Sequence, residues 1–258
     1  MSLLDELGGL SQGFQDGCIS GIVTGTVKEN YNKDEPGKVR VELFLGENGK
    51  NVTGWIPVMS SYAGTEHGSY TLPEVGSEVV VAFRMGDRNK PIVLGSLWSE
   101  KNKLPKDAAT EKNTMKEFIT KGGNEIVIDD TEDKQKITVT TKKGKSLELD
   151  EEKERLVLHD KDSKNSILID SKKGEITISA DKKVVIKTGG SDAAVFDGSG
   201  KKISLKSATI ELKADKDIAM NGQNVKLDGT STKVNGASSL QLSSSGSTQL
   251  KGTMVKIN

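Results

Sequence analysis

The second half of the chain repeatedly places two apolar residues two positions apart and separates the pairs with polar or glycine-containing segments. Alternate side chains of a β-strand point to opposite faces, so each pair predicts a short strand with one buried face. The strict pairs are Ile126/Ile128, Ile137/Val139, Leu147/Leu149, Leu156/Leu158, Ile167/Ile169, Ile176/Ile178, Val184/Ile186, Ile203/Leu205, Ile210/Leu212, Ile218/Met220, Val225/Leu227, Leu240/Leu242 and Val255/Ile257.

The spacing of these pairs changes along the chain. Early pairs are separated by charged turns such as residues 142–145 and 171–175, whereas the pairs after Ile203 follow at shorter intervals. A regular recurrence of this kind is typical of a repeat architecture, in which each unit buries its apolar face only by stacking on others.

The first 100 residues show a different pattern, with five short segments that predict strands at residues 21–27, 38–44, 55–58, 78–83 and 91–94. No helical stripe of apolar residues accompanies them. Five short strands in this length predict an all-β fold, and a Greek-key barrel of the OB type fits the count.

Composition separates the same two regions. Eight of the ten aromatic residues lie before residue 100, and residues 1–100 carry 8 basic and 13 acidic side chains. The net charge of the whole chain is zero, which argues against a nucleic-acid partner, because phosphate binding requires a surplus of Lys and Arg. One cysteine excludes an intrachain disulfide. Acidic residues near the N-terminus and the absence of a long apolar run predict synthesis in the cytoplasm without a signal peptide.

A specific motif lies in residues 72–98, where the sequence reads LPEVGSEVVVAF, then GD, then PIVLGSLW. This motif resembles the OB-fold domain of the baseplate assembly protein V and VgrG families of phage and injection-system spikes, over residues 15–100. The resemblance implies structural roles in the barrel for seven residues: Pro73, Gly76, Phe83, Gly86, Asp87, Pro91 and Gly95.

Two apolar residues per strand cannot enclose a core within one chain, since ordering each residue costs about 1–2 kcal/mol and each buried side chain contributes roughly 1.5–3 kcal/mol. Three chains wound together would share one core. The repeat also resembles the triple-stranded, intertwined trimeric β-helix of baseplate spikes. We therefore expect an N-terminal arm (1–15), an OB-fold collar (16–100), a linker (101–120) and a β-helical needle with a blunt tip (121–258).

The sequence predicts no catalytic, cofactor-binding or metal-binding residues, and hence no enzyme. His67 and His159 are far apart, and the chain lacks the His-x-His motif with which several phage spikes bind iron. The segment 143–146 (KGKS) superficially resembles a P-loop, but its first glycine is missing. The alternative is a monomeric β-helical protein that binds or cleaves glycans. That alternative predicts clustered carboxylates and aromatic residues in a groove.

The resemblance extends to the C-terminal residues, which are similar to the blunt end on which VgrG-type spikes carry a PAAR-repeat tip protein. It implies tip-protein docking by Met254, Val255, Ile257 and Asn258; the alternative is a frayed end with no partner. The expected function is a homotrimeric central spike of a contractile phage tail, tailocin or related injection system. Its expected location is the baseplate of a virion or injection particle, where it docks on a separate hub protein and pierces the target cell envelope on contraction.

Overall fold

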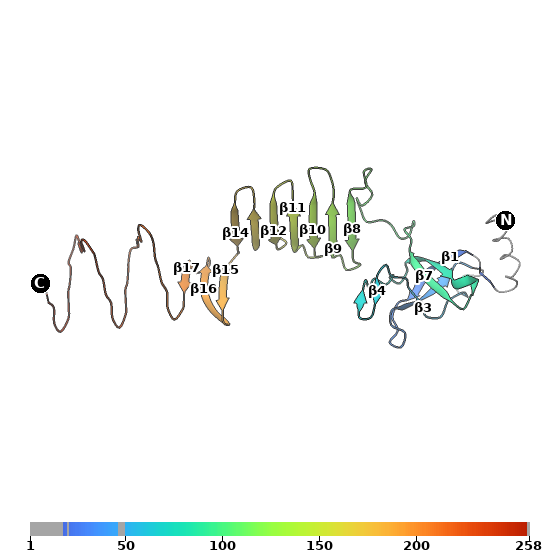
Figure 1. The fold of residues 1–258 in the computed structure, drawn as a ribbon, viewed down its shortest axis with the longest axis horizontal. Coiled ribbons are helices and arrows are strands. Elements are labelled where there is room, and N and C mark those ends of the chain that lie inside the picture. Colours follow the sequence, from blue (N-terminus) through green and yellow to red (C-terminus); the bar gives the residue numbers. More distant parts are fainter. Residues whose placement is uncertain (1–17, 20, 46–49, 257–258) are drawn as a thin grey trace, which may run out of the picture. The chain divides into compact units, whose positions relative to one another are not determined.

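The computed structural model describes residues 18–19, 21–45 and 50–256, and within them the regular secondary structure is β apart from one 3₁₀ turn (Figure 1). The first sheet contains β1 (Ile22–Glu29), β2 (Lys38–Leu43), β3 (Ile56–Pro57), β6 (Glu78–Phe83) and β7 (Pro91–Ser96), in the order β3-β2-β1-β6-β7. The five strands that the sequence predicted are therefore all present.

The sheet closes into a barrel. A parallel bridge joins Val58 to Val93, and the amide of Met59 donates to the carbonyl oxygen of Val93 at 2.8 Å, which links the end of β3 to β7. A small hairpin of β4 (Ala63–Gly64) and β5 (His67–Gly68) lies between β3 and β6 in the chain, and one 3₁₀ turn, Arg84–Gly86, joins β6 to β7. The N-terminal OB-fold barrel is confirmed.

The core of the barrel consists of side chains from alternate strand positions. Six valines are fully buried, and Ile56 and Phe83 are nearly so. β-Branched side chains pack well on a pleated surface, which explains why so small a barrel can be built around valine. The six valines are Val27, Val39, Val41, Val79, Val81 and Val93.

The second sheet is an antiparallel meander of seven strands in which every strand pairs with its neighbours in sequence (Figure 1). Each strand has five residues, and each turn has four to six residues. Short turns of this kind join antiparallel neighbours directly. The strands are β8 (Met115–Ile119), β9 (Glu125–Asp129), β10 (Lys136–Thr140), β11 (Ser146–Asp150), β12 (Arg155–His159), β13 (Ser166–Asp170) and β14 (Glu175–Ser179).

The meander differs from the expected domain plan in two respects. Strand β8 lies within the segment 101–120 that we expected to be a linker, because residues 115–119 pair along their full length with β9. The main-chain hydrogen bonds of residues 115–179 are also made within one chain, whereas the expected β-helix would pair strands between chains. The charged turns are long enough for each strand to reverse direction, so the ladder needs no partner chain here.

After the meander, β15 (Lys183–Thr188), β16 (Ser191–Asp197) and β17 (Lys202–Leu205) form a three-stranded sheet. From residue 206 to residue 256 the described chain contains no strand, and all its side chains are exposed (Figure 1). The sequence predicted strands in this segment. A strand needs a neighbour to accept its hydrogen bonds, and one copy of this segment does not supply that neighbour. No helix in the described part of the chain is long and apolar enough to span a membrane.

Candidate functional site: the apolar face of the meander

Strand pairing places the apolar pairs of the meander on one face of the sheet. Ile137 lies directly opposite Ile128 on one side and Leu149 on the other, and the same alignment continues from strand to strand. We call this surface the apolar face. Its apolar members are Phe118, Ile126, Ile128, Ile137, Val139, Leu147, Leu149, Leu156, Leu158, Ile167, Ile169, Ile176 and Ile178. Lys116 of β8, opposite Ile128, lies on the same face.

The apolar face is open to solvent in a single chain. Ile137 remains 40% exposed and Leu158 48% exposed, and on the last strand Ile176 reaches 69%. The valines of the barrel core are 0% exposed. A contiguous apolar surface that spans seven strands is far larger than the scattered apolar residues of an ordinary protein surface, and such a patch marks an interaction site.

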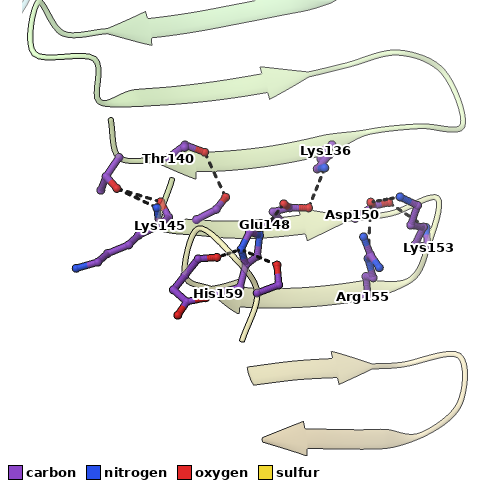
Figure 2. Close-up of polar contacts among 12 residues, drawn as sticks. Lys136, Thr140, Lys145, Glu148, Asp150, Lys153, Arg155 and His159 are labelled. Atoms are coloured by element: carbon purple, nitrogen blue, oxygen red, sulfur yellow. Dashed lines mark hydrogen bonds and ion pairs between the residues drawn. The ribbon is translucent and has the colours of Figure 1, made fainter. Parts of the chain in front are cut away.

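The opposite face of the meander is more polar, although Val127, Val157 and Leu168 occupy central positions on it. It carries a cross-strand ladder of charged side chains (Figure 2). The Lys136 ammonium on β10 lies 2.9 Å from Oε2 of Glu148 on β11, and Nε2 of His159 on β12 lies 3.1 Å from Oε1 of the same carboxylate. Nδ1 of His159 faces the carbonyl oxygen of Asp160 at 2.7 Å. Both ring nitrogens therefore face acceptors, and only the protonated imidazolium can donate to both.

The ladder lowers the pKa of its carboxylate and raises the pKa of its imidazole. The hydrogen bond from Lys136, assisted by that from His159, lowers the pKa of Glu148. The hydrogen bond from the His159 ring to the Asp160 carbonyl, together with that to Glu148, raises the pKa of His159. Opposite charges held on adjacent strands favour the charged form of each group. The arrangement is a structural cross-link between three strands.

Asp150, at the other end of β11, is the most buried acidic residue described. It lies 3.6 Å from the ammonium of Lys153 and 3.9 Å from Nε of Arg155, and it accepts the Lys153 amide at 3.0 Å (Figure 2). These contacts cap the turn between β11 and β12. Nothing in them provides a nucleophile with an adjacent base, so they are interpreted as structural.

The adjacent carboxylates of the turns form no metal cage in the described part of the chain, where no three His, Cys, Asp or Glu side chains converge. The two histidines are placed in different regions, His67 in the exposed β4–β5 hairpin and His159 at the end of β12. The structure does not bring them together.

The seven motif residues of the barrel lie on and around β6 and β7. Gly76 has φ +94° in the turn before β6, where its amide donates to the carbonyl of Val27 at 2.9 Å. Phe83 is buried at the end of β6 opposite Pro91. The remaining residues are in turns or bulges: Pro73 lies before the Gly76 turn, Gly86 and Asp87 lie in the β6–β7 connection, and Gly95 follows the register shift in β7.

Two of the expected tip-docking residues can be located. Met254 is 75% exposed and Val255 53% exposed, and neither belongs to a strand. Ile257 and Asn258 lie outside the described residues.

Sequence reasoning missed the Lys136–Glu148–His159 ladder and treated His159 as an isolated polar residue. The signal was the hairpin register: a turn over residues 151–154 places residue 148 diagonally across from residue 159. Cross-strand pairs of this kind are recognisable once the turn is fixed.

Comparison with known proteins supports the resemblance found in the sequence. Residues 23–98 match the family model of the type VI secretion system and phage-baseplate injector OB domain. Similar proteins include the type VI secretion system spike protein VgrG5 of Pseudomonas aeruginosa, which is 34% identical over 132 residues, or 48% of this chain and 17% of the relative. VgrG1b of the same organism is 28% identical over 153 residues, or 55% of this chain and 21% of the relative.

A third relative, VgrG3 of Vibrio cholerae, is 33% identical over 94 residues, or 35% of this chain and 9% of the relative. The chain therefore spans about a fifth or less of the length of these relatives. All three are named as spike proteins. The resemblance of this chain to baseplate and VgrG-type spike proteins is thus confirmed.

Proposed function

We propose that this chain is a structural, non-enzymatic spike subunit of a contractile phage tail, tailocin or type VI-like injection apparatus, and that it works as a homotrimer. The barrel would form the collar, and the segment that follows would form the needle. The injector OB domain and the VgrG relatives support the class of machine. One observation on the chain itself supports the proposed trimer: the apolar face of the meander is exposed to solvent in a single chain.

Three copies can close the apolar face that one copy leaves open. If each meander turns its apolar face toward a common axis, the paired residues of each strand meet their counterparts from two other copies. The polar face, with the Lys136–Glu148–His159 ladder, would then lie on the outside in water. A surface that was meant to bind glycans would show the reverse, with aromatic and acidic side chains on the open face.

The segment 206–256 would complete its fold only in the trimer. Its apolar pairs keep the period of strands, yet the described segment has no strand partner within one chain. Pairing between copies would satisfy those backbone groups and bury the pairs. The needle would thus combine a part paired within each chain and a part paired between chains.

At its ends the spike would meet two further proteins. The collar would dock on a baseplate hub, and the apolar tip with Met254 and Val255 would carry a PAAR-repeat tip protein. Exposed apolar side chains at 254 and 255 support a covered end, since such a surface favours aggregation when it is left open. Sheath contraction would then drive the needle through the target cell envelope.

Size-exclusion chromatography with light scattering tests the proposal. A mass of three times 27.7 kDa is expected. A band of that size should also persist in SDS without heating, because the shared core unfolds slowly. A monomer of 27.7 kDa would contradict the proposal and favour the glycan-binding alternative.

The tip assignment has its own test. Deleting residues 254–258 should leave the trimer mass unchanged and abolish co-purification of a co-expressed PAAR-repeat protein. Replacing exposed lysines of the linker, such as Lys101 and Lys103, by alanine is the matched control and should leave capture intact. Capture by the truncated chain would exclude these residues as the docking site.

A further inference from the structure

The turns of the meander carry opposite charge on its two sides. In an antiparallel meander consecutive turns alternate between the two sides of the sheet, so the turns 120–124 and 141–145 lie on one side and the turns 130–135 and 151–154 on the other. We call them the basic turn side and the acidic turn side.

In these turns the basic turn side has four lysines and no acidic residue, and the acidic turn side has six acidic residues and two lysines. The third turn on the basic side, 160–165, adds two aspartates and two lysines, and the third turn on the acidic side, 171–174, adds two lysines, so the two sides keep net charges of +4 and −2. In the first two turns of the basic turn side the charged residues are Lys121, Lys142, Lys143 and Lys145. In the first two turns of the acidic turn side they are Asp130, Glu132, Asp133, Lys134, Glu151, Glu152, Lys153 and Glu154.

Most of these charges have no counter-charge within the chain. All are exposed, and among the described residues the ammonium groups of Lys142, Lys143 and Lys145 form no ion pair. Figure 2 draws Lys145 with its side chain extended away from the strands. On the acidic turn side, Glu152 lies 3.7 Å from Lys134, whereas Glu132, Glu151 and Glu154 have no such partner in the described part of the chain.

We infer that the basic turn side of one copy docks against the acidic turn side of the next copy around the trimer, and that this contact sets how the three meanders are aligned. The inference rests on the proposed homotrimer. In a ring built by rotation, each copy offers one side to one neighbour and the opposite side to the other. The two charge patches are therefore brought together at each of the three corners.

The strand order provides the alignment. The basic turns join β8 to β9 and β10 to β11, whereas the acidic turns join β9 to β10 and β11 to β12. Along the strand order of the meander, the turns of one side therefore lie between the turns of the other side. When neighbouring copies are aligned without a shift along the trimer axis, which we call the level arrangement, these four turns can interdigitate. In the level arrangement the turn 130–135 lies between the turns 120–124 and 141–145, and the turn 151–154 lies between 141–145 and the turn 160–165, which has two aspartates and two lysines. A slip of the acidic turn side by one hairpin toward β14 would leave the turn 120–124 with no acidic turn beside it.

Charge reversal tests this contact. The variant Lys142→Glu/Lys143→Glu/Lys145→Glu should assemble into trimers about tenfold or more slowly than the wild type at low salt, since charge complementarity acts mainly on the rate of association. The difference should vanish at about 1 M salt, where the screening length falls to about 3 Å. The matched control is Lys101→Glu/Lys103→Glu/Lys106→Glu, which changes the charge equally outside the meander and should assemble at close to the wild-type rate.

Reversing both sides completes the test. Adding Glu132→Lys, Glu151→Lys and Glu154→Lys to the first variant exchanges the two patches, so refolding followed by light scattering should show assembly restored to near the wild-type rate. A combined variant as slow as the single one, or a first variant as fast as the wild type, would overturn the inference while the trimer stood. A monomeric wild-type chain would instead contradict the proposed homotrimeric spike itself.

Discussion

The barrel and the meander are built from the same local pattern, yet only the barrel buries its apolar residues. Both have strands of alternating apolar and polar side chains, and in the barrel these leave Val41 and Val81 0% exposed. The barrel closes on itself through the bridge between Val58 and Val93, whereas β8 and β14 of the meander do not pair with each other. Closure of the sheet, rather than the pattern of the strands, decides whether one chain can form a core.

The largest expected effect comes from placing charge on the apolar face. Ile137→Asp combined with Leu149→Asp puts two carboxylates directly opposite each other, where the proposed trimer has its core. Burying unpaired charges is so costly that the trimer should not form, and the mass should fall to that of one chain. The barrel should remain folded, as judged by the emission of its tryptophans.

The control for that variant lies on the other face of the same strand. Thr138→Lys adds a charge opposite Glu148 on the polar face and should leave the trimer mass unchanged. If this control also lost the trimer, the trimer interface could not be assigned to the apolar face alone.

A core change in the barrel should produce the converse result. Val81→Ala removes two methyl groups from a fully buried position, and the free energy of unfolding of the barrel should fall by about 2–3 kcal/mol. The trimer mass should not change at moderate temperature. Chemical denaturation followed by tryptophan fluorescence measures the loss, and a change below about 0.5 kcal/mol would contradict the packing described.

Gly76 should show a smaller effect, of backbone origin. No atom lies within 4 Å of a Cβ added there, so Gly76→Ala would be limited by its φ of +94° alone. We expect a loss of about 1–2 kcal/mol in the same denaturation experiment. Gly95→Ala, which also meets no atom and has no positive φ, is the control and should cost less.

The smallest effect concerns the pH dependence of the meander. The raised pKa of His159 stabilises the fold below its ordinary value near 6.5, and this contribution is lost as the pH rises through the raised value. The lowered pKa of Glu148 stabilises the fold above its ordinary value near 4.5, and this contribution is lost as the pH falls through the lowered value. The ladder therefore contributes most between about pH 5 and 6.

His159→Gln should remove the alkaline part of this dependence. The difference in Tm between wild type and variant should be largest near pH 5.5 and shrink toward pH 9. The contribution should stay below about 1 kcal/mol, because the ladder lies on an outer face of the sheet and its side chains keep partial contact with solvent. A difference that is constant across this range would show that His159 is not held in the charged form.

The sequence predicted the barrel strands and the apolar pairs because both depend on local alternation. It did not predict β8, since residues 115–119 (MKEFI) contain no strict apolar pair. Nor did it predict pairing within the chain over residues 115–179. The period of two is the same for a strand that pairs with its own chain and for one that pairs with another, and only the turn geometry separates them.

The sequence did not predict the Lys136–Glu148–His159 ladder for a related reason. Glu148 and His159 are 11 positions apart, and their contact follows from the register of one hairpin. The apolar face, by contrast, was visible in the sequence as soon as the pairs were recognised, although its exposure in one chain required the structure.

Cross-linking on the apolar face tests the central claim most directly. In a Cys18→Ser background, Ile137→Cys should be joined between copies by a short bis-maleimide, giving covalent dimers on a denaturing gel, since each chain then carries one thiol. Thr138→Cys, one residue away on the polar face, should remain monomeric under the same treatment. Equal cross-linking at both positions, or none at residue 137, would contradict an apolar face closed by copies of the same chain.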